Sequence, residues 1–401
     1  MSQPVDYAVS GLREGLTHHG AVVFNDSGGK AVKRLNVILP HFHKAYAFGG
    51  VLSAMQVAAA MTRGYEAVRF VSMYPLGDAA DMFDFAAFVH DAPRKRIEVA
   101  RVCEGDVLAC HEREVFFCTY WTTALIWREY VRQLTADGRD PRPFYYLVQD
   151  YEPGFYPMGC KQAMALSTYS YGHLTHAIFN SASLAGHFRS AGYNFAREYV
   201  LPPSLNPEIH AYLNEKNHAL QPKPEGPIRI LVYGRPEQPR NCFATIMEGL
   251  YRFFAGMPDN ERADYEIISA GQPHDDIGLA PGVTVKSVGK LPVAEYIREL
   301  EQSHIGIAFM ASPHPSYPPL EMALFGLYTI TTSFGAKDMN GVHENLRALS
   351  EPSPAALADE LERAAEKVRA GKVQTEEAVL PSCMSPMGWE ENMLKLEIEK
   401  L

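Results

Sequence analysis

The segment from Ser312 to Thr332 reads SPHPSYPPLEMALFGLYTITT and follows an apolar run, IGIAFM, at Ile305–Met310. An uninterrupted apolar run of this length favours a strand that is covered on both faces of a sheet. Four prolines then exclude regular structure until a short helix begins, and Glu321 falls in the first turn of that helix. Gly326 lies at the expected end of the helix, where glycine is a common C-cap residue, and Leu327–Thr332 predicts the next strand. The segment therefore predicts one strand, loop, helix and strand of an α/β fold.

Glu321 has two interpretations. An α/β protein presents ligand-binding groups at the carboxyl edge of its sheet, where a strand leads through a loop into a helix. A single carboxylate at this edge points to a ligand of the nucleotide type. The alternative is a buried strand-helix-strand unit in which Glu321 only caps its helix, because acidic residues are common in a first helical turn.

The composition bounds the possible folds and functions. The chain has 401 residues, of which 47% are hydrophobic and 21% charged, so it is long enough for two ordinary globular domains. Its formal net charge is -10. Non-specific nucleic-acid binding needs a strongly basic face, so the acidic balance argues against nucleic acid as a partner.

The cysteines and the apolar pattern indicate a reduced, cytoplasmic protein. The six cysteines contain no C-x-x-C pair and no zinc-like spacing with histidine, so no metal site and no metal cofactor are expected. The chain begins without a signal-peptide pattern, and no run of about 18 apolar residues predicts a membrane span. Peripheral association with the inner face of the cytoplasmic membrane is compatible with this sequence.

Apolar strand candidates alternate with helical stretches in both halves of the chain, which predicts parallel sheets with helices on both faces. In the first half the strands are expected at Leu35–Leu39, Val68–Ser72, Val115–Thr119, Phe144–Val148 and Ala177–Asn180. In the second half they are expected at Ile228–Tyr233, Tyr265–Ala270, Val283–Lys286, Ile305–Met310 and Leu327–Thr332.

A segment rich in proline and polar residues, Leu201–Pro227, separates the two halves. We therefore predict a first domain at residues 1–205, a second at 206–384, and a helix within 385–401 that packs back on the first domain. A cleft between two such domains is a natural ligand site. Near the start, Val5–Leu16 could form a helix and Asn25–Lys30 a loop.

A pair of glycines opens the first helix of the first domain. Gly49 and Gly50 stand directly before a helix expected from about Val51, and the preceding loop carries His41 and His43. Adjacent glycines allow a close approach to a phosphate, which the helix N-terminus would favour. The alternative is that the pair only makes a turn.

Basic side chains follow two strands of the second domain. Arg235 and Arg240 flank a proline-containing loop, a helix is expected from about Asn241, and Lys290 follows another strand. Two guanidinium groups could bind a diphosphate and stabilise it as it departs, and the lysine could add charge near the same place. The alternative is a pair of solvated arginines.

The segment Phe144–Gly159, FYYLVQDYEPGFYPMG, combines carboxylates with aromatic rings. Asp150 and Glu152 follow a predicted strand, and Tyr156 lies in the loop beyond it. Carbohydrate suits such a site, since a sugar presents hydroxyl groups at its rim and apolar C–H groups on its faces. The alternative is a packed loop that is rich in aromatic residues.

From about Leu35 onward these motifs resemble a known family. The QDYEP segment, the VYGRP segment, the VGKL segment and above all PHPSYPPLEMA are similar to the retaining glycosyltransferases of the GT-B fold. The likeness is greatest to the bacterial rhamnosyltransferases that build S-layer rhamnan from dTDP-L-rhamnose and to their relatives in surface-polysaccharide clusters. The resemblance implies two Rossmann-like domains with parallel sheets that face a central cleft.

The resemblance also implies residue roles. Glu321 corresponds to the carboxylate that binds the ribose hydroxyl groups. The expected donor-binding residues are Gly49, Gly50, Arg235, Arg240, Asn241, Lys290, His314, Ser316, Tyr317, Pro318 and Glu321. The expected acceptor-binding residues are His43, Asp150, Glu152 and Tyr156, and those expected to take part in catalysis are Asp150, Arg235 and Lys290.

One position departs from the pattern of the family. Many retaining GT-B enzymes carry two glutamates eight positions apart, and Pro313 occupies the first of these positions here. The group that usually handles the donor sugar must therefore be replaced, and His314 and Ser316 are the candidates.

The sequence thus predicts a metal-independent transferase that moves a deoxyhexose, L-rhamnose from dTDP-β-L-rhamnose, onto a growing surface polysaccharide with retention. The acceptor could be lipid-linked. Two rival functions remain open from the sequence: a nucleotide-sugar epimerase of the same fold, which needs an acid and a base beside the sugar C2, and a non-catalytic glycan-binding module.

Overall fold

The computed structural model describes residues 21–24, 32–43, 49–103, 105–111, 113–396 and 398. The helix expected at Val5–Leu16 and the loop expected at Asn25–Lys30 lie outside these residues. Contacts divide the chain into two compact units. The first unit contains the described residues up to Asn180 together with Gly192–Leu201 and the chain from Trp389 onward. The second contains Ser181–Ala191 and Pro202–Gly388, whereas the sequence had placed the domain limits at 205 and 384.

The first unit is built on a seven-stranded parallel sheet in the order β4-β3-β2-β6-β7-β8-β9. The strands are β2 (Arg34–Leu39), β3 (Ala67–Ser72), β4 (Arg96–Arg101), β6 (Glu114–Cys118), β7 (Phe144–Val148), β8 (Thr175–Phe179) and β9 (Arg197–Val200). Every residue of the central strands β2, β6 and β7 is buried, because helices and loops cover both faces. A separate two-stranded sheet pairs β1 (Ala21–Phe24) with β5 (Val107–Cys110).

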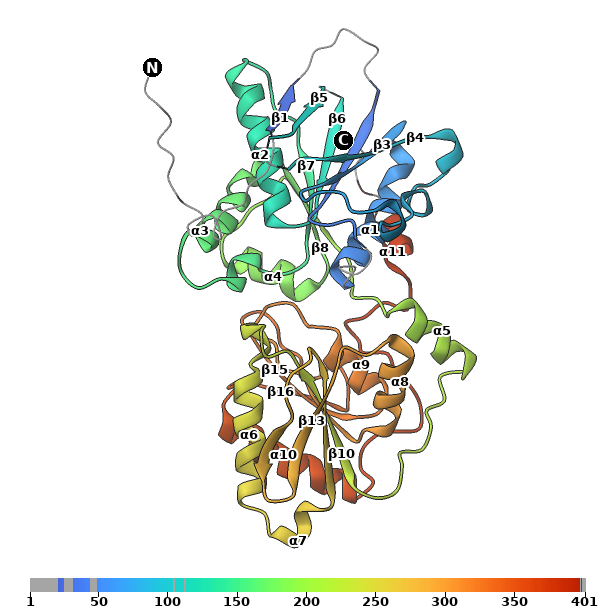
Figure 1. Cartoon of the computed structure of the whole chain (residues 1–401), viewed down its shortest axis with the longest axis vertical. Helices are drawn as coiled ribbons and strands as arrows, with labels where there is room; N and C mark the ends of the chain where they lie inside the picture. Colours follow the sequence, from blue (N-terminus) through green and yellow to red (C-terminus); the bar gives the residue numbers. More distant parts are fainter. Residues whose placement is uncertain are drawn as a thin grey trace. The chain divides into compact units, whose positions relative to one another are not determined.

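The helices of the first unit include α1 (Gly49–Met61), α2 (Trp121–Ala136), α3 (Cys160–Ser167) and the C-terminal α11 (Trp389–Lys395), while α4 (Ala182–Ser190) groups with the second unit. The chain's last helix returns to the first unit, where α11 lies beside α1 (Figure 1). Arg63, just after α1, forms an ion pair of 3.2 Å with Glu390 of α11.

The second unit has its own seven-stranded sheet in the order β12-β13-β11-β10-β14-β15-β16. The strands are β10 (Ile228–Gly234), β11 (Tyr265–Gly271), β12 (Ile277–Ala280), β13 (Val283–Gly289), β14 (Ile305–Ile307), β15 (Tyr328–Thr332) and β16 (Leu346–Leu349). All neighbours are parallel except the hairpin of β12 and β13. Without β12, the order is that of a Rossmann domain, whose direction of winding reverses between β10 and β14.

Helices cover both faces of this second sheet (Figure 1). They are α5 (Pro207–Glu215), α6 (Phe243–Ala255), α7 (Asp259–Arg262), α8 (Val293–Gln302), α9 (Pro318–Leu324) and α10 (Pro354–Arg369). Ile230 and Val232 of β10 belong to the apolar cluster that includes α6 and α10, whereas Leu231 and Tyr233 lie with the cluster of α5, α8 and α9. Side chains alternate along a strand in this way, so Tyr233 faces the α8 and α9 layer.

Short 3₁₀-helices fill the connections of both units. They are η3 (Thr62–Gly64), η4 (Ala79–Asp81), η5 (Phe85–Phe88), η6 (Ala92–Arg94), η7 (Glu152–Phe155), η8 (Thr168–Leu174) and η9 (Pro239–Asn241). Two of them, η7 and η9, directly follow β7 and β10 and so carry candidate site residues.

Two glycines end neighbouring strands of the second unit because the backbones approach closely there. A Cβ added to Gly234 of β10 would lie 1.9 Å from the Ser269 hydroxyl oxygen, and one added to Gly271 of β11 would lie 2.3 Å from the Gly234 carbonyl oxygen. Gly271 also has φ +146°, in the region that favours glycine. The close approach fixes the start of the loop that carries Arg235.

The predicted strands all occur: β7 has the predicted bounds, and the others differ from the prediction at one or both ends. Three differences of bounds bear on the candidate site. β14 ends at Ile307 and not at Met310, because the Met310 amide donates to the Thr332 hydroxyl (3.1 Å) and leaves the backbone ladder. α1 begins at Gly49, so the two glycines belong to its first turn. α6 begins at Phe243 and not at about Asn241, because Cys242 has the left-handed φ of 51° that interrupts the helix.

Among the described residues, no helix combines the length and the apolar character that crossing a membrane requires. In the same part of the chain, no group of three or more His, Cys, Asp or Glu side chains is arranged to hold a metal ion.

Candidate functional site

The loop between β14 and α9 lies at the point where the winding of the second sheet reverses, which is where Rossmann-type domains bind ligands. Pro318 is the first residue of α9, where its fixed φ favours a helix start and its missing N–H costs nothing. Glu321 lies in the first turn, as predicted, and Gly326 ends the helix with φ +77°. The proline loop therefore delivers Glu321 to the carboxyl edge of the sheet.

Glu321 is 8% exposed, and burial raises the pKa of its carboxyl group to about 7. The neighbouring Tyr296 hydroxyl, from α8, opposes that rise. The hydroxyl of Tyr317, just before α9, is buried without a hydrogen-bonding partner. A helix-capping residue needs neither this burial nor these neighbours, so the arrangement favours a ligand-binding role for Glu321.

Arg235 reaches the same side of the sheet as Glu321. Its Nη1 donates a long hydrogen bond (3.5 Å) to the Tyr233 hydroxyl oxygen. Tyr233 and Tyr296 are both packed against the layer of α5, α8 and α9, and they interact electrostatically. Two tyrosines thus connect the Arg235 guanidinium with the Glu321 carboxyl group.

The loop after β10 is tied to the loop after β14. The backbone carbonyl of Arg240 accepts a hydrogen bond from the Ala311 amide (2.7 Å), and Asn241 Nδ2 donates to the Phe309 carbonyl (3.2 Å). Asn241 is 2% exposed, and its Oδ1 is buried without a hydrogen-bonding partner. The structure therefore brings Arg240 and Asn241 to the loop that contains His314.

His314 and Ser316 form a closed turn in that loop. His314 Nδ1 accepts the Ser316 backbone N–H (3.0 Å), and Ser316 adopts the left-handed φ of 68°. His314 is 5% exposed, and burial, with the charges of Lys337 and Arg240, lowers its pKa to about 3. Nε2 therefore carries the proton of a neutral imidazole. Pro313, the residue that departs from the family pattern, offers its carbonyl to the Ser183 hydroxyl (2.8 Å).

Lys337 is a candidate that the sequence reasoning missed. It lies after β15, is fully buried, and its Nζ donates to the Met310 carbonyl oxygen (2.6 Å). The signal in the sequence was weak: a lysine in the short run GAK after an apolar strand, with no second basic residue beside it.

Lys290 lies further from the reversal point. It follows β13, which β11 separates from β10, and its side chain is exposed. It shares the carboxyl edge of the sheet with Arg235, so its predicted role in neutralising a diphosphate stays a prediction.

Three predicted residues of the first unit follow β2. His43 forms an isolated bridge with Met82, and its Nε2 lies 3.8 Å from the Asp81 carboxylate. Gly50 is next to Gln149, the residue after β7, since a Cβ on Gly50 would lie 3.2 Å from Gln149 Oε1. The first turn of α1, which contains Gly49 and Gly50, therefore lies beside the carboxyl end of β7.

The two predicted carboxylates of the first unit are both buried. Asp150 is 6% exposed and accepts a hydrogen bond from the Tyr151 amide (2.8 Å). Glu152 is 1% exposed and accepts one from the Tyr146 hydroxyl (2.7 Å). Burial first, and then the nearby charge of Asp150, raise the pKa of Glu152 to about 8. Glu152 therefore holds a proton at neutral pH in the free protein.

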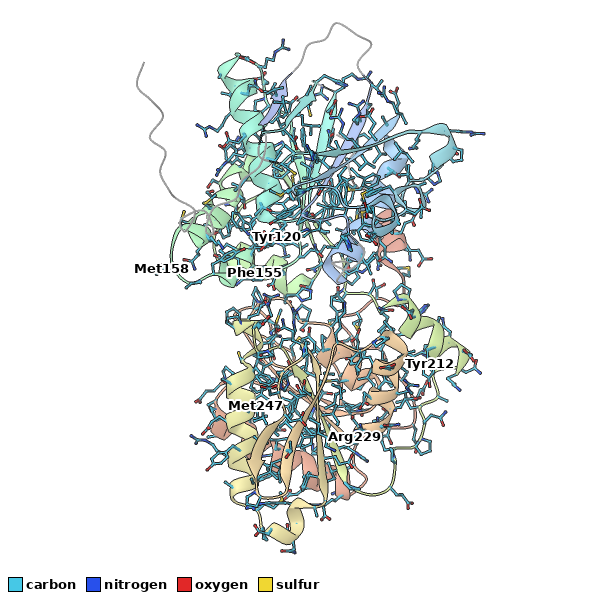
Figure 2. The ribbon with its side chains drawn as sticks, viewed as in Figure 1. Tyr120, Phe155, Met158, Tyr212, Arg229 and Met247 are labelled. Carbon is cyan, nitrogen blue, oxygen red and sulfur yellow. The ribbon has the colours of Figure 1, made fainter. Side chains whose placement is uncertain are left out.

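Tyr156 belongs to an aromatic cluster formed by Tyr120, Trp121, Phe155 and Tyr156. The Tyr156 hydroxyl oxygen lies 2.7 Å from that of Tyr120 and accepts the Trp121 indole N–H (3.0 Å). Figure 2 shows Tyr120 and Phe155 close together. Their ring centroids are 6.4 Å apart, and the ring planes are nearly parallel. Such a cluster offers ring faces beside hydroxyl groups, as a sugar-binding surface requires.

Replacing Tyr156 with phenylalanine is expected to lower the unfolding free energy of the first unit by about 1 to 2 kcal/mol, because the Trp121 N–H loses its acceptor. Urea unfolding followed by tryptophan fluorescence measures this change, since Trp121, Trp127 and Trp389 all lie in the first unit. Tyr171→Phe is the matched control, because Tyr171 is a partly buried tyrosine of the same unit whose edge-on ring contact with Trp127 the phenylalanine keeps. Equal unfolding free energies of Tyr156→Phe and Tyr171→Phe would contradict the hydrogen bond from the Trp121 N–H to the Tyr156 hydroxyl.

The geometry described above belongs to a known class of protein. Two Rossmann-type units joined in one chain, with the last helix returning to the first unit, define the GT-B glycosyltransferases. Two domain models match the chain: "WsaF, N-terminal domain" at residues 34–182 and "WsaF, C-terminal domain" at residues 228–362. Together they cover more than half of the chain, which therefore belongs to the WsaF family of glycosyltransferases.

Similarity to an individual relative covers a smaller part of this chain than the two domain models do. The O-antigen biosynthesis protein RfbC of Myxococcus xanthus is 29% identical over 230 residues, which are 56% of this chain and 17% of that protein. The chain thus spans less than a fifth of the length of that relative.

Two solved structures share the fold. Sucrose-phosphate synthase from Thermosynechococcus elongatus has a TM-score of 0.52 at 12% identity, with 91% of this chain and 94% of that chain covered. An α,α-trehalose-phosphate synthase (UDP-forming) from Burkholderia xenovorans has a TM-score of 0.51 at 9% identity, with 90% and 96% covered. At these identities the likeness concerns the fold alone.

Proposed function

We propose that this glycosyltransferase moves a deoxyhexose, L-rhamnose from dTDP-β-L-rhamnose, onto a growing cell-surface polysaccharide with retention of configuration and without a metal ion. Membership of the WsaF family and the relative named for O-antigen biosynthesis support a polysaccharide acceptor. The observation that carries the proposal is the buried Glu321 carboxyl group, connected through Tyr296 and Tyr233 to Arg235.

In this proposal the second unit holds the donor. Glu321 accepts hydrogen bonds from the sugar hydroxyl groups of the nucleoside, and Arg235, Arg240 and Lys290 neutralise the diphosphate. His314 and Ser316 take the place of the missing glutamate at Pro313 and contact the donor sugar or its phosphate. Positive charge held before the reaction stabilises the departing nucleoside diphosphate without reorganisation at the moment of reaction.

The first unit holds the acceptor in this proposal. The aromatic cluster provides ring faces for an acceptor sugar, and Asp150 orients the hydroxyl group that attacks. His43 and Glu152 complete the acceptor side, while Gly49 and Gly50 allow a phosphate to approach the start of α1. The acceptor could be lipid-linked, which would require the protein to work at the inner face of the cytoplasmic membrane.

The proposed chemistry is a single displacement on one face of the sugar. The acceptor oxygen forms a bond to the anomeric carbon while the bond from that carbon to the β-phosphate oxygen breaks. The proton of the acceptor hydroxyl moves to the departing phosphate oxygen, so that no external base is needed. Attack from the leaving-group side retains the anomeric configuration.

Incubation with dTDP-L-rhamnose and a rhamnosylated acceptor tests the proposal. We expect dTDP release that depends on the acceptor, and an NMR spectrum of the product that shows the configuration of the donor. An epimerised donor would instead support the epimerase, and binding without any product would support the glycan-binding module. If the nucleoside diphosphate is released from another nucleotide sugar and not from dTDP-rhamnose, the assignment of the donor is wrong, but the assignment as a transferase stands.

A further inference from the structure

Two aromatic rings lie face to face at the carboxyl edge of the first sheet. His41 follows β2 and Tyr74 follows β3, and their ring centroids are 4.2 Å apart with an angle of 7° between the planes. Burial, and then the nearby charge of His43, lower the pKa of His41, so the stacked imidazole is neutral at neutral pH. Tyr74 is 51% exposed. Because the imidazole covers one face of the Tyr74 ring, the opposite face is the one that a ligand can reach.

The surrounding backbone and core fix the position of this pair. The Ser72 hydroxyl accepts a hydrogen bond from the Tyr74 amide (3.1 Å) and donates one to the Tyr74 carbonyl oxygen (2.8 Å). Phe42, the residue after His41, is buried and packs edge-on against Phe85, with ring centroids 4.8 Å apart. The exposed ring face is therefore in place before a ligand binds, so that binding has little additional ordering to offset.

The stacked pair lies next to the aromatic cluster described above. Thr122, which follows Trp121 of that cluster, donates its hydroxyl hydrogen to the sulfur of Met73 (3.1 Å), and Met73 directly precedes Tyr74. β3 and β6 are the two neighbours of β2, so their carboxyl ends are two strand spacings, about 10 Å, apart. This separation exceeds the length of one sugar residue. A glycan that lies along this edge would therefore contact the cluster and the stacked pair with different sugar residues.

The charges around the stacked pair favour an uncharged ligand. Residues 73–89 include three aspartates, Asp78, Asp81 and Asp84, and no lysine or arginine. Asp78 and Asp81 are exposed, and His43 Nε2 lies 3.8 Å from the Asp81 carboxylate. Carboxylates repel a phosphate group, whereas they accept hydrogen bonds from the hydroxyl groups of a sugar. An exposed ring face beside such acceptors suits a neutral sugar better than a nucleotide.

We propose that Tyr74, supported by His41, binds a sugar residue of the acceptor glycan that lies beyond the residue at the aromatic cluster. This inference rests on the proposed function of the first unit as the acceptor-binding unit. It adds Tyr74 and His41 to the acceptor-binding residues, and it assigns His43 and Asp81 to the hydroxyl groups of this distal sugar. The site gives the enzyme a preference for acceptors that are already several sugars long, which suits the extension of a polysaccharide.

The test measures transfer by the full chain to rhamnosylated acceptors from a monosaccharide glycoside to a tetrasaccharide. We expect the wild type to have a higher kcat/KM for the tetrasaccharide, and Tyr74→Ala to lower this preference about 3- to 10-fold, because the distal sugar loses its ring contact. Tyr74→Phe keeps the ring face and should keep the preference. Tyr251→Ala, which removes a tyrosine of similar exposure (50%) from α6, is the control. Equal losses in Tyr74→Ala for all acceptor lengths, or no loss, would overturn the inference.

His41 supplies a second arm of the test. His41→Ala removes the ring that supports Tyr74, whereas His41→Phe keeps a flat ring in the same place. We expect His41→Ala to lower the preference for the tetrasaccharide about 3-fold and His41→Phe to restore most of it. Losses of the same size in these two variants would count against a support that acts by stacking.

Binding of the glycans without a donor separates this inference from the proposed donor. In calorimetry, the wild-type chain should bind the tetrasaccharide more tightly than the monosaccharide, and Tyr74→Ala should lose this difference. If it does so but no sugar is transferred from dTDP-rhamnose, then the glycan site stands and the donor assignment fails. If transfer occurs and Tyr74→Ala keeps the preference of the wild type, then the donor assignment stands and the inference fails. A wild-type chain that binds no glycan and transfers no sugar contradicts both.

Discussion

Replacing Glu321 with alanine is expected to weaken dTDP binding by about 10- to 100-fold, because the nucleoside loses a charge-assisted hydrogen bond to a buried carboxylate. The sugar of dTDP offers its 3′-hydroxyl to this group, whereas a ribonucleotide offers two hydroxyls. The loss should therefore be larger for UDP than for dTDP wherever both bind. Isothermal calorimetry of the full chain measures both affinities.

The raised pKa of Glu321 adds a dependence on pH. Because the pKa is about 7, the carboxylate form makes up about a tenth of the free protein at pH 6 and about nine tenths at pH 8. If only the carboxylate accepts the hydroxyl group, then dTDP should bind the wild-type chain about 10-fold more tightly at pH 8 than at pH 6. Glu321→Gln should remove the part of this dependence that does not arise from the phosphates.

Glu321→Ala, which is expected to weaken dTDP binding, is expected to increase the stability of the folded protein at high pH. The folded-state pKa of Glu321 lies above its usual value of 4.5, so this group costs stability as the pH rises from about 4.5 to 7. Glu321→Ala should therefore need a higher urea concentration to unfold at pH 8. The corresponding rise in its unfolding free energy is up to about 3 kcal/mol before any loss of packing. Glu362→Ala, an exposed glutamate on α10, should change neither binding nor stability. Unchanged dTDP affinity in Glu321→Ala would refute the assignment.

The fold could be predicted from the sequence wherever a strand is buried on both faces. The runs that became β2, β7 and β15 are distinctive because every residue of these strands is buried, so that water contacts neither face. Edge strands leave no such pattern. β4 has no fully buried residue, and β12 and β16 have four residues each, so the local pattern does not reveal these strands.

The candidate site was predictable where one segment of chain carries it. Glu321, Tyr317 and His314 lie within eight residues of each other, and the prolines between them mark a loop before a helix. Lys337 belongs to the same region only because β15 pairs with β14 and the following turn sends its side chain to Met310. Contacts of this kind depend on strand order, which a local pattern does not contain.

The protonation of buried titratable groups is also not contained in a local sequence pattern. Composition around Glu152 indicated a carboxylate among aromatic rings, and two interpretations, sugar-binding site or packed loop, were left open. In the structure Tyr146 holds a Glu152 that is fully enclosed, as in a packed loop, while Tyr120 and Phe155 are partly exposed, so the sugar-binding interpretation stays a prediction. Spacing along the chain places the carboxylate after β7, but burial alone sets its protonation.

Replacing Glu152 with glutamine is expected to change the dependence of stability on pH by about 4 kcal/mol between pH 5 and pH 9. In the folded first unit the pKa of Glu152 is about 8, compared with a usual value of 4.5. The folded state therefore keeps a proton that the unfolded state releases, and wild-type stability falls as the pH rises through this window. Glutamine has a similar shape and cannot ionise, so its variant should lack this part of the fall.

The measurement is urea unfolding at a series of pH values, followed by the fluorescence of the three tryptophans, all of which lie in the first unit with Glu152. If the amide changes the unfolding free energy by an amount that does not depend on pH, the whole curve of unfolding free energy against pH shifts for the variant. The difference in slope between the two curves therefore reports only the proton bound by Glu152. Glu129→Gln, on the exposed side of α2, should follow the wild type at every pH. Parallel curves for the wild type and Glu152→Gln would show that Glu152 is ionised in the folded protein. In that case two neighbouring carboxylates, Asp150 and Glu152, would both carry charge on the acceptor side, and Asp150 could no longer be distinguished as the group that orients the acceptor hydroxyl.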